Sequence, residues 1–363
     1  MAVQKISIQQ FLQMAPACLV LDVRSPGEFA HAHIPNAVSL PLFSDEERKV
    51  VGTAYKQESR EKAIKAGLHY FGPKMAVMVE QVEQIIASKK IRPTSKNNQG
   101  FVTSNPQTIV VHCWRGGMRS AGVAWLLDLY GFTVYTITGG YKTFRKWVLQ
   151  QFEKQYDLKV IGGYTGSGKT LLLHQLQQTG AITIDLEGLA AHKGSAFGDL
   201  GEPPQPSQEM FENLLAVTLE PISNKCIWLE DESQRIGSVH IPNTLYQNKQ
   251  SAAVYFIDIP FEERLKYITA GYGKFPKERL INAIVRIKKR LGGLETKTAI
   301  NYLLEDDVTN CFAVLLKYYD KGYLKGLHKR DNLTELLKNI PCEKVDTEAN
   351  AVELNKQSLV FSI

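Results

Sequence analysis

The sequence predicts an α/β protein with two parallel-sheet domains, and three observations carry that prediction. The apolar runs at residues 108–111 and 158–161 each pass through a glycine-bearing loop into a helical pattern, the strand–loop–helix order of parallel sheets. At 363 residues the chain is long enough for two domains with separate cores. Its last third has a basic helical pattern. We therefore expect domains at residues 1–156 and 157–363, the second with a helical basic C-terminal part.

The composition indicates an ordinary globular protein with a mild excess of positive charge. Hydrophobic residues make up 44% and charged residues 22%, and the formal charge of +6 permits a polyanionic partner without requiring one. The cysteines are odd in number and include no C-x-x-C pair, which argues for a reducing compartment and against disulfides or a structural metal. They are Cys18, Cys113, Cys226, Cys311 and Cys342. We see neither a signal-peptide core nor a run of about 18 apolar residues, so we expect a cytoplasmic protein without a membrane partner.

The pattern of the first domain predicts helices and short strands around an insertion. Its early elements are a helix at 6–14, a strand at 18–23, a helix at 26–30 and a strand at 37–40. Residues 44 to about 105 read as a helical insertion, with helical patterns at 45–65 and 73–89 and a polar loop at 92–105. After the strand at 108–111 we expect a helix at 120–130, a strand at 134–137 and a helix at 142–155.

The loop after residues 108–111 presents a cysteine where an anion would bind. Cys113 ends the strand, and Arg119 closes a C-x5-R pattern at the start of the next helix. The loop residues between them are Trp114, Arg115, Gly116, Gly117 and Met118. Backbone amides and a helix N-terminus concentrate partial positive charge at such a turn, which lowers the pKa of a thiol. Arg119 can hold an oxyanion with its forked donors. We therefore interpret Cys113 as a nucleophile rather than an inert buried cysteine.

Together with upstream residues, this loop resembles that of a rhodanese domain. The upstream match consists of residues 21–29, Leu-Asp-Val-Arg-Ser-Pro-Gly-Glu-Phe, and residues 33–37, His-Ile-Pro-Asn-Ala. The resemblance implies that Asp22, Arg24 and Glu28 brace the loop rather than react. Rhodanese loops usually hold one residue fewer between cysteine and arginine. The wider loop here has the size seen in related phosphatases, and we expect it to admit a tetrahedral anion.

The second glycine-rich loop, residues 163–170, has the G-x-x-x-x-G-K-T spacing of a P-loop. It follows the strand at 158–161 and precedes a helical pattern at 171–178, the context that the motif requires. The residues expected to bind a diphosphate are Gly163, Gly166, Ser167, Gly168, Lys169 and Thr170. Lys169 would neutralise the diphosphate and Thr170 is a candidate ligand of Mg²⁺. Because the loop contacts phosphates alone, it does not specify the rest of the ligand.

Further strands and helices complete the second domain. We expect a strand at 182–185, a loop over the phosphates at 188–201, a helix at 208–216, a strand at 226–229, a strand at 253–257 and a helix from 258. Glu230 and Asp231 are further candidates for Mg²⁺, although a plain strand end explains them nearly as well. Arg235 is a candidate anion contact. After residue 332 we expect a short helix and a poorly determined tail.

Residues 261–331 carry fifteen Lys and Arg against nine Asp and Glu. Basic residues recur at helical spacing beside an apolar side of Ile281, Ile284, Ile287 and Leu291. The candidates for nucleic-acid contacts are Arg279, Arg286, Lys289, Arg290, Lys317, Lys321 and Lys325, with the interleaved Tyr318, Tyr319 and Tyr323 as candidates for stacking on unpaired bases. A solvated basic face is an equally good interpretation.

The two loops in this order resemble the tRNA 2-selenouridine synthase family over nearly the whole chain. The resemblance implies a rhodanese-like parallel-sheet domain with a helical insertion, followed by a P-loop NTPase-like α/β domain. It also implies a transferase that converts 2-thiouridine to 2-selenouridine at the wobble position of the Lys, Glu and Gln tRNAs. Geranyl diphosphate would first alkylate the sulfur. Selenium from selenophosphate, carried on Cys113 as an S-selanyl adduct, would then replace it.

On this interpretation each loop serves one step. Arg119, Gly116 and Gly117 would hold selenophosphate, Arg115 would help phosphate to leave, and the P-loop would hold the diphosphate of the geranyl donor. We expect no tightly bound organic cofactor, and a selenophosphate-producing enzyme is a candidate partner. Two alternatives remain. One is a C-x5-R phosphatase or sulfurtransferase fused to an ATPase, and the other is a nucleotide-switched binding module in which Cys113 is structural.

Overall fold

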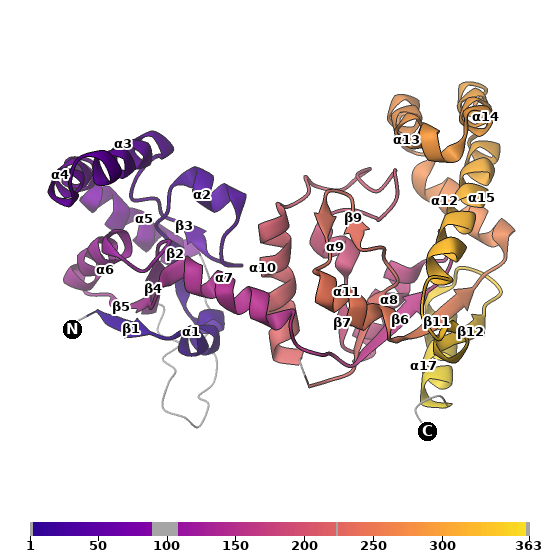
Figure 1. Ribbon diagram of the computed structural model, residues 1–363, viewed down its shortest axis with the longest axis horizontal. Coiled ribbons are helices and arrows are strands. Elements are labelled where there is room, and N and C mark those ends of the chain that lie inside the picture. Colours follow the sequence, from indigo (N-terminus) through magenta and orange to yellow (C-terminus); the bar gives the residue numbers. More distant parts are fainter. Residues whose placement is uncertain (1–2, 89–107, 223, 361–363) are drawn as a thin grey trace. The chain divides into compact units, whose positions relative to one another are not determined.

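The computed structural model describes residues 3–88, 108–222 and 224–360, which divide into two compact units, Met1–Gln150 and Gln151–Ile363 (Figure 1). Each unit is built on a five-stranded parallel sheet, which confirms the predicted α/β class. The predicted polar loop at 92–105 lies outside the described residues. A search of the described helices finds none with the length and apolar character needed to cross a membrane.

The sheet of the first unit has the strand order β1-β5-β4-β2-β3. Its strands are β1 (Gln4–Ile6), β2 (Leu19–Asp22), β3 (Val38–Ser39), β4 (Thr108–His112) and β5 (Thr133–Ile137). Every residue of β2 and β4 is buried, as expected for inner strands of a parallel sheet covered on both faces. Because β4 lies in the middle, its carboxyl end opens at the edge where parallel sheets bind ligands. Cys113 follows β4 at that point.

The helices of the first unit cover this sheet. They are α1 (Ile8–Met14), α2 (Pro26–His31), α3 (Asp45–Gln57), α4 (Arg60–Phe71), α5 (Met75–Ser88), α6 (Met118–Tyr130) and α7 (Gly140–Gln151), with 3₁₀ helices at Ala15–Ala17 and Gly72–Lys74. The helical pattern at 45–65 is two helices, because Ser59 caps α4 by accepting from Lys62 N–H. Helix α6 begins two residues earlier than expected, which puts Arg119 in its first turn.

The sheet of the second unit has the order β12-β11-β6-β8-β7. Its strands are β6 (Leu158–Gly162), β7 (Thr183–Ile184), β8 (Ile227–Glu230), β11 (Ala253–Asp258) and β12 (Leu337–Pro341). Between β8 and β11 in the sequence, the two short strands β9 (Arg235–Ile236) and β10 (Val239–His240) pair with each other as an antiparallel ribbon. The P-loop follows β6, the middle strand, so both predicted loops begin at the carboxyl end of a central strand.

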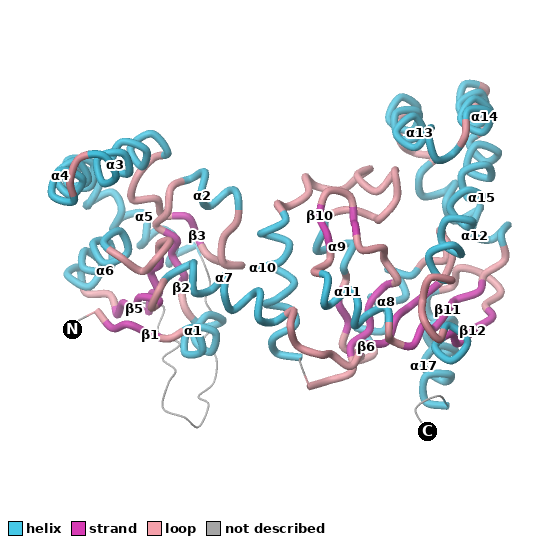
Figure 2. Tube along the Cα trace, in the orientation of Figure 1, coloured by secondary structure: helices cyan, strands magenta, loops and turns pink. Residues whose placement is uncertain are grey.

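The helices of the second unit fall into two groups. Those around the sheet are α8 (Lys169–Gln178), α9 (Leu186–Ala190), α10 (Gln208–Leu219), α11 (Asn243–Gln250), α16 (Leu333–Leu336) and α17 (Thr347–Val360), with a 3₁₀ helix at Glu220–Ile222. The others are α12 (Phe261–Tyr272), α13 (Lys277–Leu291), α14 (Gly293–Leu304) and α15 (Val308–Leu327), which Figure 2 shows grouped at one side. They share an apolar core that includes Ile284, Ile287 and Leu291, as the spacing of α13 predicts.

The prediction of a poorly determined tail after residue 332 was wrong. Strand β12 pairs in parallel with β11 along its whole length and forms an edge of the sheet. Helix α17 then packs on α8, where Ala351 and Leu354 join one apolar cluster with Leu172 and Leu176. The signal was weak because β12 reads Leu-Lys-Asn-Ile-Pro and buries Ile340 alone.

Candidate functional site

The start of helix α7 is hydrogen-bonded to the backbone of the Cys113 loop. Tyr141 N–H donates to the Cys113 carbonyl and Lys142 N–H to the Trp114 carbonyl, each at 2.9 Å. This turns the first two carbonyls of the loop toward α7. Gly140 has a φ of +59°, and a Cβ there would collide with the Cys113 carbonyl oxygen. Glycine is therefore required for α7 to approach the loop so closely.

The thiol of Cys113 lies at the N-terminal turn of α6. Its Sγ is 3.3 Å from Ser120 Oγ, and the side chain is 3% exposed. Burial opposes ionisation, but hydrogen bonds from the hydroxyl and the amide of Ser120, together with the charge of Arg119, outweigh it and lower the pKa of Cys113. The local structure thus lowers the pKa of this thiol, which is the direction expected at the start of a helix.

The other cysteines show the opposite behaviour. All five lie in the described part of the chain. Burial raises the pKa of Cys18 and of Cys342 to about 11 and that of Cys311 to about 12. Burial also raises the pKa of Cys226, helped by Asp157. Among these five thiols Cys113 alone has a lowered pKa, so it is the one of the five best suited to nucleophilic chemistry.

Of the three predicted bracing residues, Glu28 reaches the loop directly. Arg119 Nη1 donates to Glu28 Oε2 at 2.7 Å, so this part of the guanidinium faces a carboxylate rather than an open anion site. Asp22 and Arg24 form a buried pair with an Arg24 Nη2–Asp22 Oδ2 distance of 2.6 Å, and Arg24 Nη2 also donates to the Ala32 carbonyl at 2.7 Å. This pair therefore fixes the segment that carries Glu28.

Sequence reasoning missed His112, the residue before Cys113. Its ring is fully buried, with Nε2 3.8 Å from Asp22 Oδ2, and burial lowers the pKa of His112 to about 4. The imidazole is therefore neutral at physiological pH. A histidine that ends an apolar strand next to a reactive cysteine was the available signal. By contrast, Trp114 and Met118 are 37% and 51% exposed beside the buried thiol.

The P-loop has the backbone that its glycines allow. Gly163, Gly166 and Gly168 have φ values of +144°, +83° and +72°, which residues with a Cβ rarely adopt. Lys169 begins α8, and its Nζ donates to the Gly163 carbonyl at 3.0 Å. Folded back in this way, the lysine closes the loop around the space that a diphosphate would fill. Ser167 Oγ is buried and has no hydrogen-bond partner among the described residues.

Two side chains from the helical group tie this loop in place. Tyr323 Oη accepts from Gly163 N–H at 3.1 Å and donates to Asp231 Oδ2 at 2.8 Å. Arg264 Nη1 donates to the Thr165 carbonyl at 3.0 Å, and the same guanidinium makes a bidentate pair with Asp320. Helices α12 and α15 therefore fix the P-loop, a relationship that no local sequence pattern predicts.

The carboxylates near the P-loop differ from those expected. Asp231 accepts from Lys249 Nζ at 2.8 Å and from Arg330, so its carboxylate is paired with two cationic side chains. Glu230 is buried and accepts from Leu186 N–H at 3.2 Å. Instead, the carboxylate that contacts Thr170, the candidate Mg²⁺ ligand of the P-loop, is Glu187. Thr170 Oγ1 donates to Glu187 Oε2 at 2.8 Å. Within the described ranges, no group of three or more His, Cys, Asp or Glu side chains could hold a metal ion.

Glu187 is paired with a second glutamate that sequence reasoning also missed, Glu232. Burial raises the pKa of Glu232 to about 8, with a further contribution from the charge of Glu187. Burial likewise raises the pKa of Glu187, although Thr170 and Lys169 oppose the shift. The pair therefore retains a proton near neutral pH. The acidic run at residues 230–232 was a signal for Glu232, but its order along the chain could not show which acid faces the P-loop.

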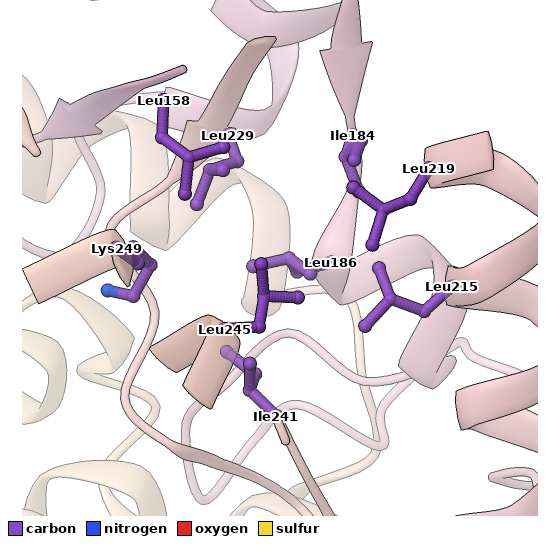
Figure 3. A pocket seen from close by; sticks show the side chains of 9 residues that line it. All are labelled: Leu158, Ile184, Leu186, Leu215, Leu219, Leu229, Ile241, Leu245 and Lys249. Atoms are coloured by element: carbon purple, nitrogen blue, oxygen red, sulfur yellow. The ribbon is translucent and has the colours of Figure 1, made fainter. Parts of the chain in front are cut away.

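The buried Lys249 explains why Asp231 is unavailable to a metal. Its side chain is 2% exposed, and its stem lines a small apolar cavity with Leu158, Leu229 and Leu245 (Figure 3). In Figure 3 the lysine nitrogen points away from these leucines, and it donates to Asp231. The cavity has about 10 Å³, too little for more than one water molecule, so it is no ligand site.

A much larger cavity of about 1050 Å³ lies against the P-loop. Its polar lining residues include Lys169, Thr170, Glu187 and Glu232. Side chains of α12 and α15 also line it, together with the cations Lys274, Arg290 and Arg330. The expected covering loop also contributes, with Lys193, Gly194, Ser195 and Phe197. Arg235, a predicted anion contact, is not among the lining residues, and its Nε donates to the Gly237 carbonyl at 2.7 Å.

The predicted basic residues are all exposed. They are Arg279, Arg286, Lys289, Arg290, Lys317, Lys321 and Lys325. Arg286 also pairs with Asp199 at 2.9 Å, and Arg290 also lines the large cavity.

The tyrosines of this region mostly face inward. Tyr319 Oη accepts from Ala196 N–H at 3.1 Å, Tyr323 is committed to the P-loop, and Tyr318 lines the large cavity. The interpretation of Tyr319 and Tyr323 as free stacking platforms for bases is therefore wrong.

Comparison with known proteins matches both units. Residues 156–340 match the model of the tRNA 2-selenouridine synthase AAA domain, and residues 7–146 match that of the rhodanese-like domain. A tRNA 2-selenouridine synthase of Sulfurovum sp. (strain NBC37-1) is 35% identical over 302 residues, covering 77% of each chain. One from Nitrosomonas europaea is 32% identical over 349 residues, 93% of this chain and 84% of the relative. One from Pseudomonas putida (strain W619) is 32% identical over 376 residues, 96% of each.

Proposed function

This chain belongs to the tRNA 2-selenouridine synthase family, and on that premise we propose that it converts 2-thiouridine at the wobble position of tRNA to 2-selenouridine. The observation that carries the proposal is Cys113, whose pKa is lowered at the start of α6 while the other thiols have raised values. The exposed basic residues of α13 and α15 are the surface that we assign to the tRNA backbone. The acceptors would be the Lys, Glu and Gln tRNAs.

The first step that we assign is S-geranylation at the P-loop. A thiocarbonyl sulfur leaves poorly, and geranyl transfer turns it into a group that departs as the neutral geranyl thiol. Transfer breaks the bond from carbon to the diphosphate oxygen, so negative charge grows on the departing diphosphate. Lys169 and the amides of residues 163–170 would stabilise that charge. Thr170, with Glu187 beside it, is the position where Mg²⁺ would join the diphosphate.

The second step that we assign is selenation at the Cys113 loop. Selenophosphate, supplied by another enzyme, would lie against the amides of Gly116 and Gly117 at the start of α6. Arg119 would contribute a forked donor whose position Glu28 sets. The selenium of selenophosphate, held beside Cys113, would attack C2 of the base, and the bond from C2 to sulfur would break to release the geranyl thiol. Water would then cleave the selenium–phosphorus bond and release phosphate, so that selenium stays at the same oxidation level throughout.

The test is nucleoside analysis of 2-thiouridine tRNA after incubation with geranyl diphosphate, with and without selenophosphate. We compare the wild type, Cys113→Ser and Lys169→Ala. The proposal expects Cys113→Ser to stop at the S-geranyl nucleoside and Lys169→Ala to form no geranylated product. Normal geranylation by Lys169→Ala would contradict the role of the P-loop.

The same assay separates the alternatives. Full selenation by Cys113→Ser would mean that the thiol is structural, as in a nucleotide-switched binding module. No change in the tRNA, together with phosphate release from an aryl phosphate that depends on Cys113, would indicate a C-x5-R phosphatase. Cys311→Ser is a control for loss of a buried thiol, because Cys311 lies in the core of the helical group.

A further inference from the structure

An exposed tryptophan lies next to the reactive cysteine. Trp114 directly follows Cys113 in the chain, so the two Cα atoms are about 3.8 Å apart. The side chain of Cys113 is 3% exposed, whereas that of Trp114 is 37% exposed. The indole therefore offers a flat apolar surface to a molecule that approaches the thiol.

A stack of buried groups holds this indole in place. Its ring centroid is 5.6 Å from that of Tyr141, which is fully buried. The guanidinium carbon of Arg24 lies 3.9 Å from the centroid of the Tyr141 ring, and Arg24 is itself paired with Asp22. The Trp114 carbonyl also accepts from Lys142 N–H at 2.9 Å. Because Trp114 is fixed in this way on its inner side, a ligand that stacks on its exposed part costs little side-chain entropy.

Cationic side chains surround this tryptophan. Residues 114–147 contain five Lys and Arg and a single acid. Arg115 is the next residue and is exposed, and Lys142, whose amide donates to the Trp114 carbonyl, is exposed as well. Lys146 follows about one turn later on α7 and is also exposed. A planar ring beside several cations is the composition that binds unpaired nucleotides, since the ring stacks on a base while the cations contact phosphates.

Trp125 on α6, a second exposed tryptophan of this unit, lacks these neighbours. It is 53% exposed, but residues 120–141 around it contain no Lys or Arg. A single exposed apolar side chain of this kind is ordinary for a protein surface. What distinguishes Trp114 is the combination of rigid support, neighbouring cations and an adjacent reactive thiol.

We infer that Trp114 is the stacking platform for the unpaired wobble base of the tRNA, and that Arg115, Lys142 and Lys146 contact the neighbouring phosphates. The inference rests on the proposed selenation at the Cys113 loop and adds to it a tRNA-binding surface on the first unit. Stacking on Trp114 holds the base next to Cys113, where its C2 atom has to meet selenium.

The test is fluorescence anisotropy of a labelled anticodon stem-loop RNA with 2-thiouridine at the wobble position, titrated with the full chain. Trp114→Ala should weaken binding by at least about fivefold, the lower end of the loss expected when a base–aromatic stack is removed. Trp125→Ala is the matched control and should bind as the wild type does. Wild-type affinity in Trp114→Ala, or an equal loss in Trp125→Ala, would overturn the inference.

A second RNA separates stacking from damage to the fold. It is the same stem-loop with an abasic wobble nucleotide, which keeps the phosphates and has no base to stack. Trp114→Ala should bind this RNA as tightly as the wild type does. Trp114→Phe retains an aromatic ring and should keep most of the affinity for the complete stem-loop. An equal loss for the two RNAs, or the same loss in Trp114→Phe as in Trp114→Ala, would contradict stacking.

The salt dependence of binding tests the cations. In the double variant Lys142→Gln and Lys146→Gln, the slope of log affinity against log salt should become shallower by about 1.4, because each phosphate contact to a single strand contributes about 0.7. The charge-matched control combines Lys56→Gln and Lys65→Gln, two exposed positions on α3 and α4. The same change of slope in both double variants would assign the effect to net charge and refute the contacts.

Selenation of S-geranylated tRNA distinguishes failure of this inference from failure of the proposed function. Trp114→Ala should raise the KM for this tRNA. Formation of 2-selenouridine by the wild type with an unchanged KM in Trp114→Ala refutes the platform and leaves the proposed function standing. Stem-loop binding that depends on Trp114, without any selenated product from the wild type, refutes the proposed function and leaves the platform.

Discussion

Arg119 Nη1 donates to Glu28 Oε2 at 2.7 Å, although 91 residues separate the two in the sequence. Glu28 lies on α2 and also accepts from Ser25 N–H at 3.2 Å, so the capping of α2 and the position of Arg119 depend on one carboxylate. Burial opposes ionisation of this group, yet the hydrogen bond and charge of Arg119 lower the pKa of Glu28 overall. Glu28 is therefore ionised at neutral pH and fixes the arginine that we assign to selenophosphate.

Glu28→Gln should slow selenation without preventing geranylation. The amide cannot hold Arg119 by charge, and loss of a charged hydrogen bond is worth about 1.5–3 kcal/mol, or roughly tenfold or more in rate. Nucleoside analysis under limiting selenophosphate measures the effect. Glu47→Gln is the control, since Glu47 pairs with Lys74 on the same unit without contacting the loop. Equal selenation by the two variants would rule out a positioning role for Glu28.

Ser120→Ala should raise the pKa of Cys113. The serine hydroxyl supplies one of the hydrogen bonds that offset the burial of the thiol. Iodoacetamide alkylation as a function of pH, followed by peptide mass analysis, reports the midpoint for each cysteine. We expect the Cys113 midpoint to move to higher pH in Ser120→Ala and to stay in place in Ser88→Ala, which alters an exposed serine at the end of α5. An unchanged Cys113 midpoint in Ser120→Ala would show that the Ser120 hydroxyl does not lower the pKa of Cys113.

Tyr323→Phe should weaken diphosphate binding and destabilise the second unit. The variant leaves Gly163 N–H without its acceptor and removes a donor from Asp231. An unsatisfied buried polar group costs about 1–3 kcal/mol. Thermal unfolding and pyrophosphate titration measure the two effects. Tyr318→Phe on the same helix should change stability little. Equal losses of stability and of pyrophosphate affinity in the two variants would show that Tyr323 does not fix the P-loop.

Local patterns predicted the elements that bear both loops, because strand, turn and helix occur within a few residues of each other. The glycine spacing at residues 163–170 specifies its own backbone, and the P-loop has the positive φ values that this spacing needs. Likewise, the cysteine and arginine of the C-x5-R pattern lie on either side of the start of α6. Such features depend on neighbours in sequence, which a single chain displays.

Partners distant in sequence could not be predicted in the same way. Asp231 and Glu232 are adjacent in an acidic run, yet Asp231 faces Lys249 and Arg330 while Glu232 faces Glu187. Nothing in the run itself assigns these directions, since successive residues after a strand turn to different sides. The same applies to Tyr319 and Tyr323, whose helical spacing suggested a surface and whose hydroxyl groups bond inside the unit.

Glu232 should make stability depend on pH. Its pKa is about 8 in the folded protein against an ordinary value of 4.5, so the folded form binds more protons than the unfolded form between these values. The contribution is complete below pH 4.5 and is lost as pH rises through about 8. We expect the melting temperature of the ligand-free protein to fall over that range, and Glu232→Gln to flatten the fall. Glu335→Gln, at an exposed position, should retain it. A flat profile in the wild type would contradict the raised pKa.

Ile340→Ala should destabilise the second unit and reduce diphosphate binding only through that loss. Ile340 is fully buried on β12, beside Ile257 and Leu354 in the cluster that also includes Leu172 of α8. Truncating a buried isoleucine costs about 2–5 kcal/mol. Chemical denaturation measures the loss, and Glu343→Ala, at an exposed position just after β12, should remain within about 0.5 kcal/mol of the wild type. Because α8 begins at Lys169, β12 and α17 support the helix that carries the P-loop lysine, and an unchanged stability in Ile340→Ala would mean that this edge of the sheet contributes nothing to that support.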